Sequence, residues 1–119
     1  MSYIDGFVVP VPVGKKAEYE ALCSKAAKIF QEYGALHVVE AWGDDVPEGK
    51  VTDFRRAVAA EPGETVVFSW IVWPSKEVRD AANKKMMTDE RMKMDDNNPF
   101  DGKRMIYGGF EPILDTHAK

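Results

Sequence analysis

Polar side chains stand at strand positions where the surrounding pattern predicts apolar ones: Asp5, His37, Glu40, Arg104 and Tyr107. Because strand side chains alternate between two faces, Glu40 shares a face with Leu36, Val38 and Trp42. An ionised carboxylate in an apolar region needs a partner or takes a raised pKa, and groups perturbed in this way are candidates for functional sites. The alternation therefore predicts that Glu40 points into an otherwise apolar pocket.

The same set of residues suggests a possible catalytic group. Histidine titrates near neutral pH, so His37 could act as a general base. Arg104 could pair with Glu40 or bind an anionic substrate through two parallel hydrogen bonds, and Tyr107 could donate a hydrogen bond. The alternative is structural, because internal ion pairs and edge charges also fix the register of strands. The sequence leaves both interpretations open.

Aromatic residues could add a flat apolar surface to such a pocket. Trp42, Trp70 and Trp73 all lie in predicted strands, where aromatic side chains serve either a ligand or the core. Our candidate ligand-binding residues are Asp5, Glu40, Trp42 and Trp70.

Other chemistries find little support in the residue pattern. The spacing of His37, His117 and Cys23 does not match a tetrahedral metal site. The acidic stretch 95–98 lacks the spaced oxygens and closing glutamate of a calcium loop. Cys23 falls on the apolar stripe of a predicted helix, which indicates an inert thiol. We expect no metal and no cofactor.

Composition narrows the class of protein. The 119 residues predict a single domain over 1–119, and 45% of them are hydrophobic, as in ordinary globular proteins. With 16 Lys and Arg against 20 Asp and Glu, the net charge is −4, which argues against nucleic acid and anionic membranes as partners. The single cysteine, the absence of a secretion signal pattern and the absence of a long apolar run predict a cytoplasmic protein.

The strand predicted over 65–73 is apolar on both faces. Phe68 and Trp70 lie on one face, and Val67 and Ile71 lie on the other. A strand of this kind must be covered on two sides. One small domain has helices for one face only, so the second face is expected to meet another copy of the chain.

The other periodicities predict the order of elements: a strand over 3–12, a helix over 15–33, a strand over 35–43, a helix capped by Ser75 and a last strand over 103–114. Residues 51–60 are ambiguous. Thr52 could cap a short helix that buries Phe54 and Val58, but the same residues alternate as a strand would; we favour the helix.

This order predicts an α+β fold of the ferredoxin-like type, β-α-β-β-α-β. Two helices would lie on one face of a four-stranded antiparallel sheet. Two such sheets, packed face to face about a twofold axis, would form a dimeric α/β barrel with a cleft between the sheets. We therefore expect a homodimer.

Five runs of residues resemble the bacterial YbaA-like family of small proteins: 5–9, 45–54, 66–71, 74–83 and 99–110. The resemblance extends along nearly the whole chain. It implies a ferredoxin-like dimeric α/β barrel, and it implies no activity, because the family is classed as a domain of unknown function.

Three functions are compatible with these observations. A homodimer that binds a small molecule between its sheets is the interpretation we favour. A cofactor-independent enzyme, monooxygenase-like or lyase-like, is suggested only by analogy of fold. RNA association would use the run 103–110, but Met105 and Ile106 interrupt the basic and aromatic pattern of RNA-recognition motifs.

Overall fold

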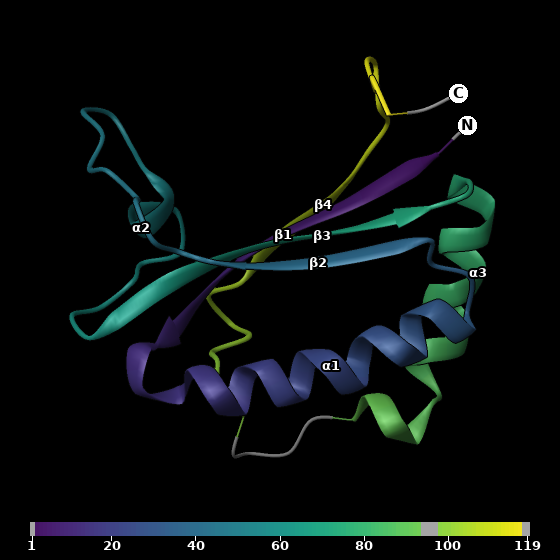
Figure 1. The fold of residues 1–119 in the computed structure, drawn as a ribbon, viewed down its shortest axis with the longest axis horizontal. Coiled ribbons are helices and arrows are strands. Elements are labelled where there is room, and N and C mark those ends of the chain that lie inside the picture. The colour runs from purple at the N-terminus through teal and green to yellow at the C-terminus, as the bar shows by residue number, and fades with distance from the viewer. Residues whose placement is uncertain (1, 94–97, 118–119) are drawn as a thin grey trace.

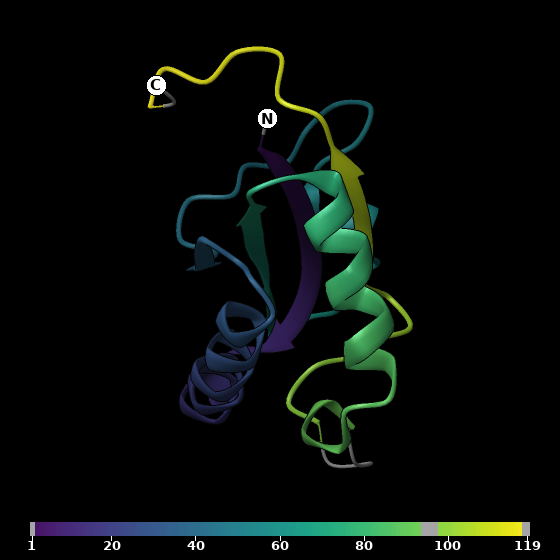
Figure 2. The same ribbon diagram turned by 90° about the vertical axis from the view of Figure 1, so that its right-hand side faces the viewer.

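A computed structural model describes residues 2–93 and 98–117. The elements, in chain order, are β1 (Tyr3–Pro12), the 3-10 turn η1 (Val13–Lys15), α1 (Lys16–Glu32), β2 (His37–Trp42), α2 (Phe54–Ala57), β3 (Glu64–Trp73), α3 (Lys76–Met87), the 3-10 turn η2 (Glu90–Met92) and β4 (Ile106–Phe110). The predicted α+β class is confirmed. The two long helices, α1 and α3, lie on one side of the sheet (Figures 1 and 2).

The sheet has four antiparallel strands in the order β2-β3-β1-β4. Its two central strands, β1 and β3, pair along their whole lengths, from Tyr3 opposite Trp73 to Pro12 opposite Glu64. β4 pairs with β1 only as far as Val8. Beyond Val8, β1 has no partner on the β4 side, which accommodates Pro10 and Pro12 because proline cannot donate to a ladder.

The main core lies between the sheet and the helices. One cluster joins Val9, Val11 and Val67 to Tyr19 of α1. A second cluster joins Ile71 and Trp73 to the segments around α1 and α3, including the buried residues Ala35 and Ala82. These strand residues share one face because each lies an even number of positions from the next.

The opposite face of the sheet is apolar too, as the sequence predicted, but the chain itself covers part of it. Val58, from the excursion between β2 and β3, packs on Val8 and Val66 at one end of this face. Figure 1 shows that excursion, which carries α2, beside one end of the strands. Farther along the face, Phe68 is 45% exposed and Phe110 is 58% exposed. The excursion was not expected to cover this face, so less of it remains open than predicted.

The short helix α2 confirms the helical interpretation of residues 51–60, with a different cap. Asp53, not Thr52, is the N-cap, because its carboxylate accepts hydrogen bonds from the backbone N–H groups of Arg56 at 2.8 Å and Gly49 at 3.1 Å. Val58 is buried as predicted, whereas Phe54 is 49% exposed.

The last strand is shorter than predicted at both ends. Before it, the backbone N–H of Arg104 donates to the Asp101 carbonyl at 3.2 Å, and the N–H of Lys103 donates to the Asp101 carboxylate at 2.9 Å. This local turn replaces strand pairing. After the strand, Pro112 cannot donate to a ladder.

The Ser75 cap of α3 is confirmed, because its hydroxyl accepts from the Val78 N–H at 3.2 Å. Of the acidic stretch 95–98, residues 95–97 lie outside the described residues. Within residues 2–93 and 98–117, no helix combines the length and apolar character needed to span a membrane.

Candidate functional site

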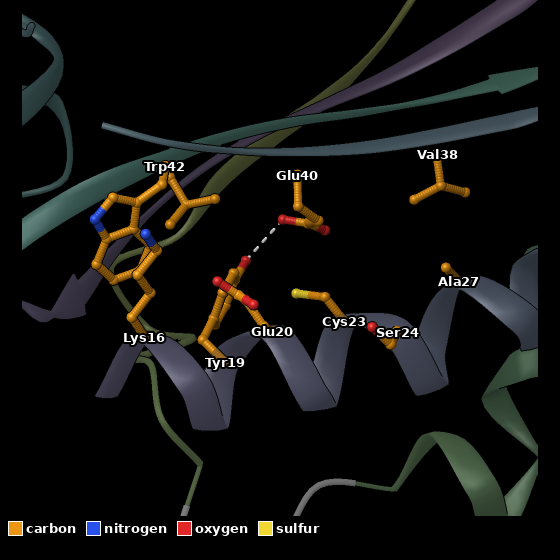
Figure 3. A pocket seen from close by; sticks show the side chains of 10 residues that line it. Lys16, Tyr19, Glu20, Cys23, Ser24, Ala27, Val38, Glu40 and Trp42 are labelled. Atoms are coloured by element: carbon orange, nitrogen blue, oxygen red, sulfur yellow. Dashed lines mark hydrogen bonds between the residues drawn. The ribbon is translucent and has the colours of Figure 1, made fainter. Parts of the chain in front are cut away.

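Three side chains that can exchange protons meet between α1 and β2. Tyr19 and Cys23 lie one helical turn apart on α1, so both face the sheet. Glu40 comes from the middle of β2 and points toward the helix, in register with Ser69 on β3. The Tyr19 hydroxyl donates a hydrogen bond to Glu40 Oε1 at 2.9 Å, and the Cys23 thiol lies beside both groups (Figure 3).

These groups line a cavity of about 330 Å³, whose wall also includes Lys16, Val38 and Trp42. On the other side of the same three groups lies a second, more apolar cavity of about 460 Å³. Both volumes fall in the range of small-molecule sites, roughly 300 to 1,000 Å³. The sequence predicted that Glu40 shares a face with Val38 and Trp42 and points into an otherwise apolar pocket. The structure brings these three residues together in one cavity, but polar side chains such as Glu20 and Ser24 line it as well.

Burial raises the pKa of Glu40 above its ordinary value, although hydrogen bonds from Tyr19, Ser69 and Cys23 act in the opposite direction. Glu40 as a whole residue is exposed, so water reaches part of its side chain. The protein atoms around its carboxyl group nevertheless remove much of its hydration. This environment suits a carboxyl group that changes its protonation state when a ligand enters.

Burial and the negative charge of Glu40 also act on its two neighbours. Together they raise the pKa of Cys23 to about 12 and hold the pKa of Tyr19 well above its usual value. Cys23 is therefore a thiol, not a thiolate, at neutral pH, in agreement with the inert role expected for it.

Trp42 closes one end of the cavity, next to a positive charge. The ammonium nitrogen of Lys16 lies 5.6 Å from the centre of the Trp42 ring, which is within the range of a cation–π contact. Trp42 was predicted to bind a ligand, and the structure brings it together with Glu40 in one cavity.

Asp5, another predicted ligand-binding residue, lies elsewhere and is already paired. Its carboxylate is buried and accepts hydrogen bonds from Arg79 Nη2 at 2.8 Å and Trp73 Nε1 at 2.9 Å. Arg79 also lies over the ring of Tyr3, 5.1 Å from its centre. Gly109 is opposite Asp5 on β4, where a Cβ atom would collide with Tyr3 and Arg79.

Arg104 does not pair with Glu40, so that part of the prediction is wrong. Its guanidinium forms two parallel hydrogen bonds of 2.8 Å with Glu64, a third of 2.8 Å with Asp101 and a fourth of 2.9 Å with the Ala59 carbonyl. These contacts occupy the donors that an anionic substrate would need. The physical reason is position, since Arg104 precedes β4 at the end of the sheet where Glu64 begins β3.

The remaining predicted residues are also dispersed. His37 and Trp70 lie on the face of the sheet away from the cavity, because their register places them with Val39 and Phe68. Tyr107 lies on the exposed edge strand β4, is 73% exposed and stacks on Phe7 with ring centres 6.4 Å apart. The expected catalytic set does not meet at one place.

Sequence reasoning missed the contribution of α1. Cys23 was interpreted as part of an apolar stripe on the predicted helix, and Lys16 was not considered. The available signal was the spacing from Lys16 to Tyr19 to Cys23, three and four residues, which places them on one side of a helix. In residues 2–93 and 98–117, no group of His, Cys, Asp and Glu side chains is arranged to hold a metal ion. Most of the acidic stretch 95–98 lies outside those ranges.

An antiparallel sheet with its helices on one face, and a cavity between the two layers, defines a small single-sheet α+β protein. The chain belongs to the family described as "Protein of unknown function (DUF1428)", whose model matches residues 2–102. It is 66% identical, over 116 residues, to the uncharacterized protein YbaA of Escherichia coli K12 and to that of Shigella flexneri; the match covers 97% of this chain and 99% of each relative. The predicted family is thus confirmed.

A solved structure of a de novo designed protein, Foldit4, resembles the fold with a TM-score of 0.50. The likeness covers 94% of this chain and 99% of the designed chain, at 12% sequence identity. It concerns the fold alone.

Proposed function

We propose that this protein is a cytoplasmic homodimer that binds a small organic molecule in the cavity between α1 and β2. The observation that carries the proposal is the placement of Glu40, a carboxyl group with a raised pKa, on the wall of a cavity of about 330 Å³. A cavity of this size, in which polar groups converge beside an apolar wall, has the usual features of a ligand site.

The lining supports recognition of a molecule with one polar end. Val38, Val67 and Ala27 form apolar wall, while Tyr19 and Glu40 supply directional hydrogen bonds. A ligand that enters displaces water from the apolar wall, and its polar end meets Glu40. This cavity differs from the cleft between two sheets that the sequence suggested, which would require the second copy.

The open face of the sheet supports the homodimer. Apolar side chains of β3 and β4, among them Phe68, Ile106 and Phe110, are about half exposed there. Phe68 also contacts the rings of Trp70 at 5.5 Å and Phe54 at 6.1 Å, so the aromatic surface is continuous. A second copy would bury it by packing sheet on sheet, and the strand order suits the ferredoxin-like dimeric α/β barrel.

A ligand screen with a blocked cavity tests the binding function. Metabolites of differing charge are added, and thermal stability and amide NMR shifts are measured for the wild type, Ala27→Phe and Ala21→Phe. Ala27 lines the cavity, whereas Ala21 is exposed on the same helix and lines neither cavity. A ligand of this site stabilises the wild type and Ala21→Phe but not Ala27→Phe. If no compound gives this pattern, the proposal fails.

A cofactor-independent enzyme is the second candidate, and one observation favours it. Glu40 has a raised pKa and a phenol as hydrogen-bond partner, which is an arrangement suited to a general acid or base. In this role Glu40 would replace the dispersed His37, Arg104 and Tyr107. Product formation from any ligand found in the screen, lost in Glu40→Gln while binding persists, would favour the enzyme over simple binding.

A further inference from the structure

We propose that the cavity binds a molecule with an ammonium group, which lies between the carboxylate of Glu40 and the ring of Trp42. The inference rests on the proposed binding function and names the chemical class of its ligand. It follows from the charges around the cavity, from the contact of Lys16 with Trp42 and from the apolar wall.

Glu40 has no cationic partner of its own among the described residues. The side chains that donate hydrogen bonds to its carboxylate, those of Tyr19, Ser69 and Cys23, are all neutral, and none of the ion pairs in the described part of the chain includes Glu40. A carboxylate can accept about four hydrogen bonds, so acceptor capacity remains on the cavity side. An ammonium group would supply the missing positive charge and offset the desolvation that burial imposes on Glu40.

The opposite side of the cavity already holds a cation. Lys16 Nζ lies 5.6 Å from the centre of the Trp42 ring, so the ring presents its negative face to a positive charge. Lys16 is exposed and sits at the start of α1, and its long side chain can swing into solvent at little cost. A ligand ammonium can therefore take its place beside the ring.

The balance of charge disfavours an anion at the same position. Two carboxylates, Glu20 and Glu40, line this cavity, against a single lysine, Lys16. An anionic ligand would face both carboxylates, whereas a cation gains attraction from each of them. The apolar wall formed by Val38 and Val67 suits a hydrocarbon or aryl group attached to the ammonium.

Three ligands of similar shape and different charge test the proposal: phenethylammonium, phenethyl alcohol and hydrocinnamate. Binding to the full chain is followed by amide NMR shifts around Tyr19, Glu40 and Trp42. We expect phenethylammonium to bind about tenfold more tightly than the alcohol, and hydrocinnamate to bind least. In Glu40→Gln, this preference for the cation disappears while the alcohol still binds.

Lys16→Met supplies a second test, because it clears the Trp42 ring and removes a competing charge. We expect it to strengthen the binding of phenethylammonium severalfold. Lys28→Met is the matched control, since Lys28 is exposed on the same helix and lines neither cavity, and its loss changes the net charge equally. It should leave the affinity almost unchanged.

The inference is overturned, and the binding function left standing, if the alcohol or the anion binds as tightly as phenethylammonium. It is overturned in the same way if the preference for the cation survives in Glu40→Gln. No binding of phenethylammonium at millimolar concentration would also overturn it. The broader function fails separately, if the metabolite screen finds no ligand whose effect is lost in Ala27→Phe.

Discussion

The Tyr19 hydroxyl donates a hydrogen bond of 2.9 Å to Glu40, and this contact joins the first helix to an edge strand of the sheet. The two residues are 21 positions apart in the chain. Their contact separates a polar cavity, next to Trp42, from a more apolar one, next to Phe30 and Ile71. The protonation state of Glu40 therefore affects both the stability of the layer contact and the character of the cavity.

Glu40 should make stability depend on pH in a definite direction. Because burial raises its pKa in the folded state above the ordinary 4.5, its contribution to stability is present at low pH and is lost as pH rises through the folded-state pKa. As the pH rises from the ordinary pKa of 4.5 to the folded-state pKa, we expect the free energy of unfolding of the wild type to fall relative to that of Glu40→Gln. Urea denaturation at a series of pH values measures the difference. A constant difference across the series would contradict the assignment.

Tyr19→Phe tests the titration of Glu40 in a second way. The Tyr19 hydroxyl stabilises the ionised form of Glu40, so its removal should raise the pKa of Glu40 further. The loss of stability with rising pH should then be larger, and it should extend to a higher pH than in the wild type. A shift in the opposite direction would show that Tyr19 does not act through the carboxylate.

Asp5 should be among the most sensitive polar positions in the fold. Asp5 is 6% exposed and is held by Arg79 and Trp73. Asp5→Ala would leave the buried Trp73 indole N–H without an acceptor and would remove one of the two carboxylates that the half-buried Arg79 contacts, leaving Asp80 as the other. We expect a loss of roughly 3 kcal/mol in the free energy of unfolding. Chemical denaturation checks this value. Lys76→Met, which breaks an exposed ion pair with Asp80, is the control and should change stability little.

Arg104 should act as a structural clamp at the end of the sheet. It holds Glu64, Asp101 and the Ala59 carbonyl, so its loss frees the segment before β4 from the start of β3. Arg104→Lys should not restore the clamp, because a lysine cannot form two parallel hydrogen bonds with Glu64. We expect faster amide hydrogen exchange in β4 for both Arg104→Met and Arg104→Lys. Protection equal to that of the wild type in the lysine variant would argue against this role.

The same pair predicts a response to acid. Hydrogen bonds from Arg104 lower the pKa of Glu64 from its ordinary 4.5, so the stability that this pair contributes is present above that pH and is lost as pH falls through the folded-state pKa. The difference in the free energy of unfolding between the wild type and Arg104→Met should therefore become smaller as the pH falls. This pH dependence is opposite in sign to that expected for Glu40. Denaturation curves for Arg104→Met and Glu40→Gln at matched pH values distinguish the two pH dependences.

Local patterns in the sequence predicted the elements well, for physical reasons. The strand over 3–12 was predicted by its pattern of apolar residues, and the start of α3 was predicted by Ser75, whose hydroxyl caps the helix as expected. The face of the sheet on which Glu40 lies was predicted from its position two residues after Val38, because alternate residues of a strand share a face. Each of these depends only on residues that are close in the chain.

The meeting of distant polar groups could not be predicted in the same way. Arg104 and Glu64 are 40 residues apart, and only the strand order and register bring them together. One error was avoidable, however. His37 and Glu40 are three residues apart on one strand, so alternation places them on opposite faces and rules out a shared pocket within one chain. The contribution of Tyr19 required knowledge of how α1 docks on the sheet.

The homodimer can be tested by placing a charge on the open face of the sheet. Phe68 is 45% exposed in the middle of the apolar surface that a second copy would cover, so Phe68→Lys would put a positive charge on each of two facing sheets. We expect sedimentation at micromolar concentration to find dimers of the wild type and monomers of this variant. Met87→Lys is the matched control, because Met87 is 84% exposed at the end of α3, on the helix side of the sheet. It should remain dimeric. A wild type that is monomeric at this concentration and fully folded would remove the need for a second copy, and the open face would then be available to some other partner.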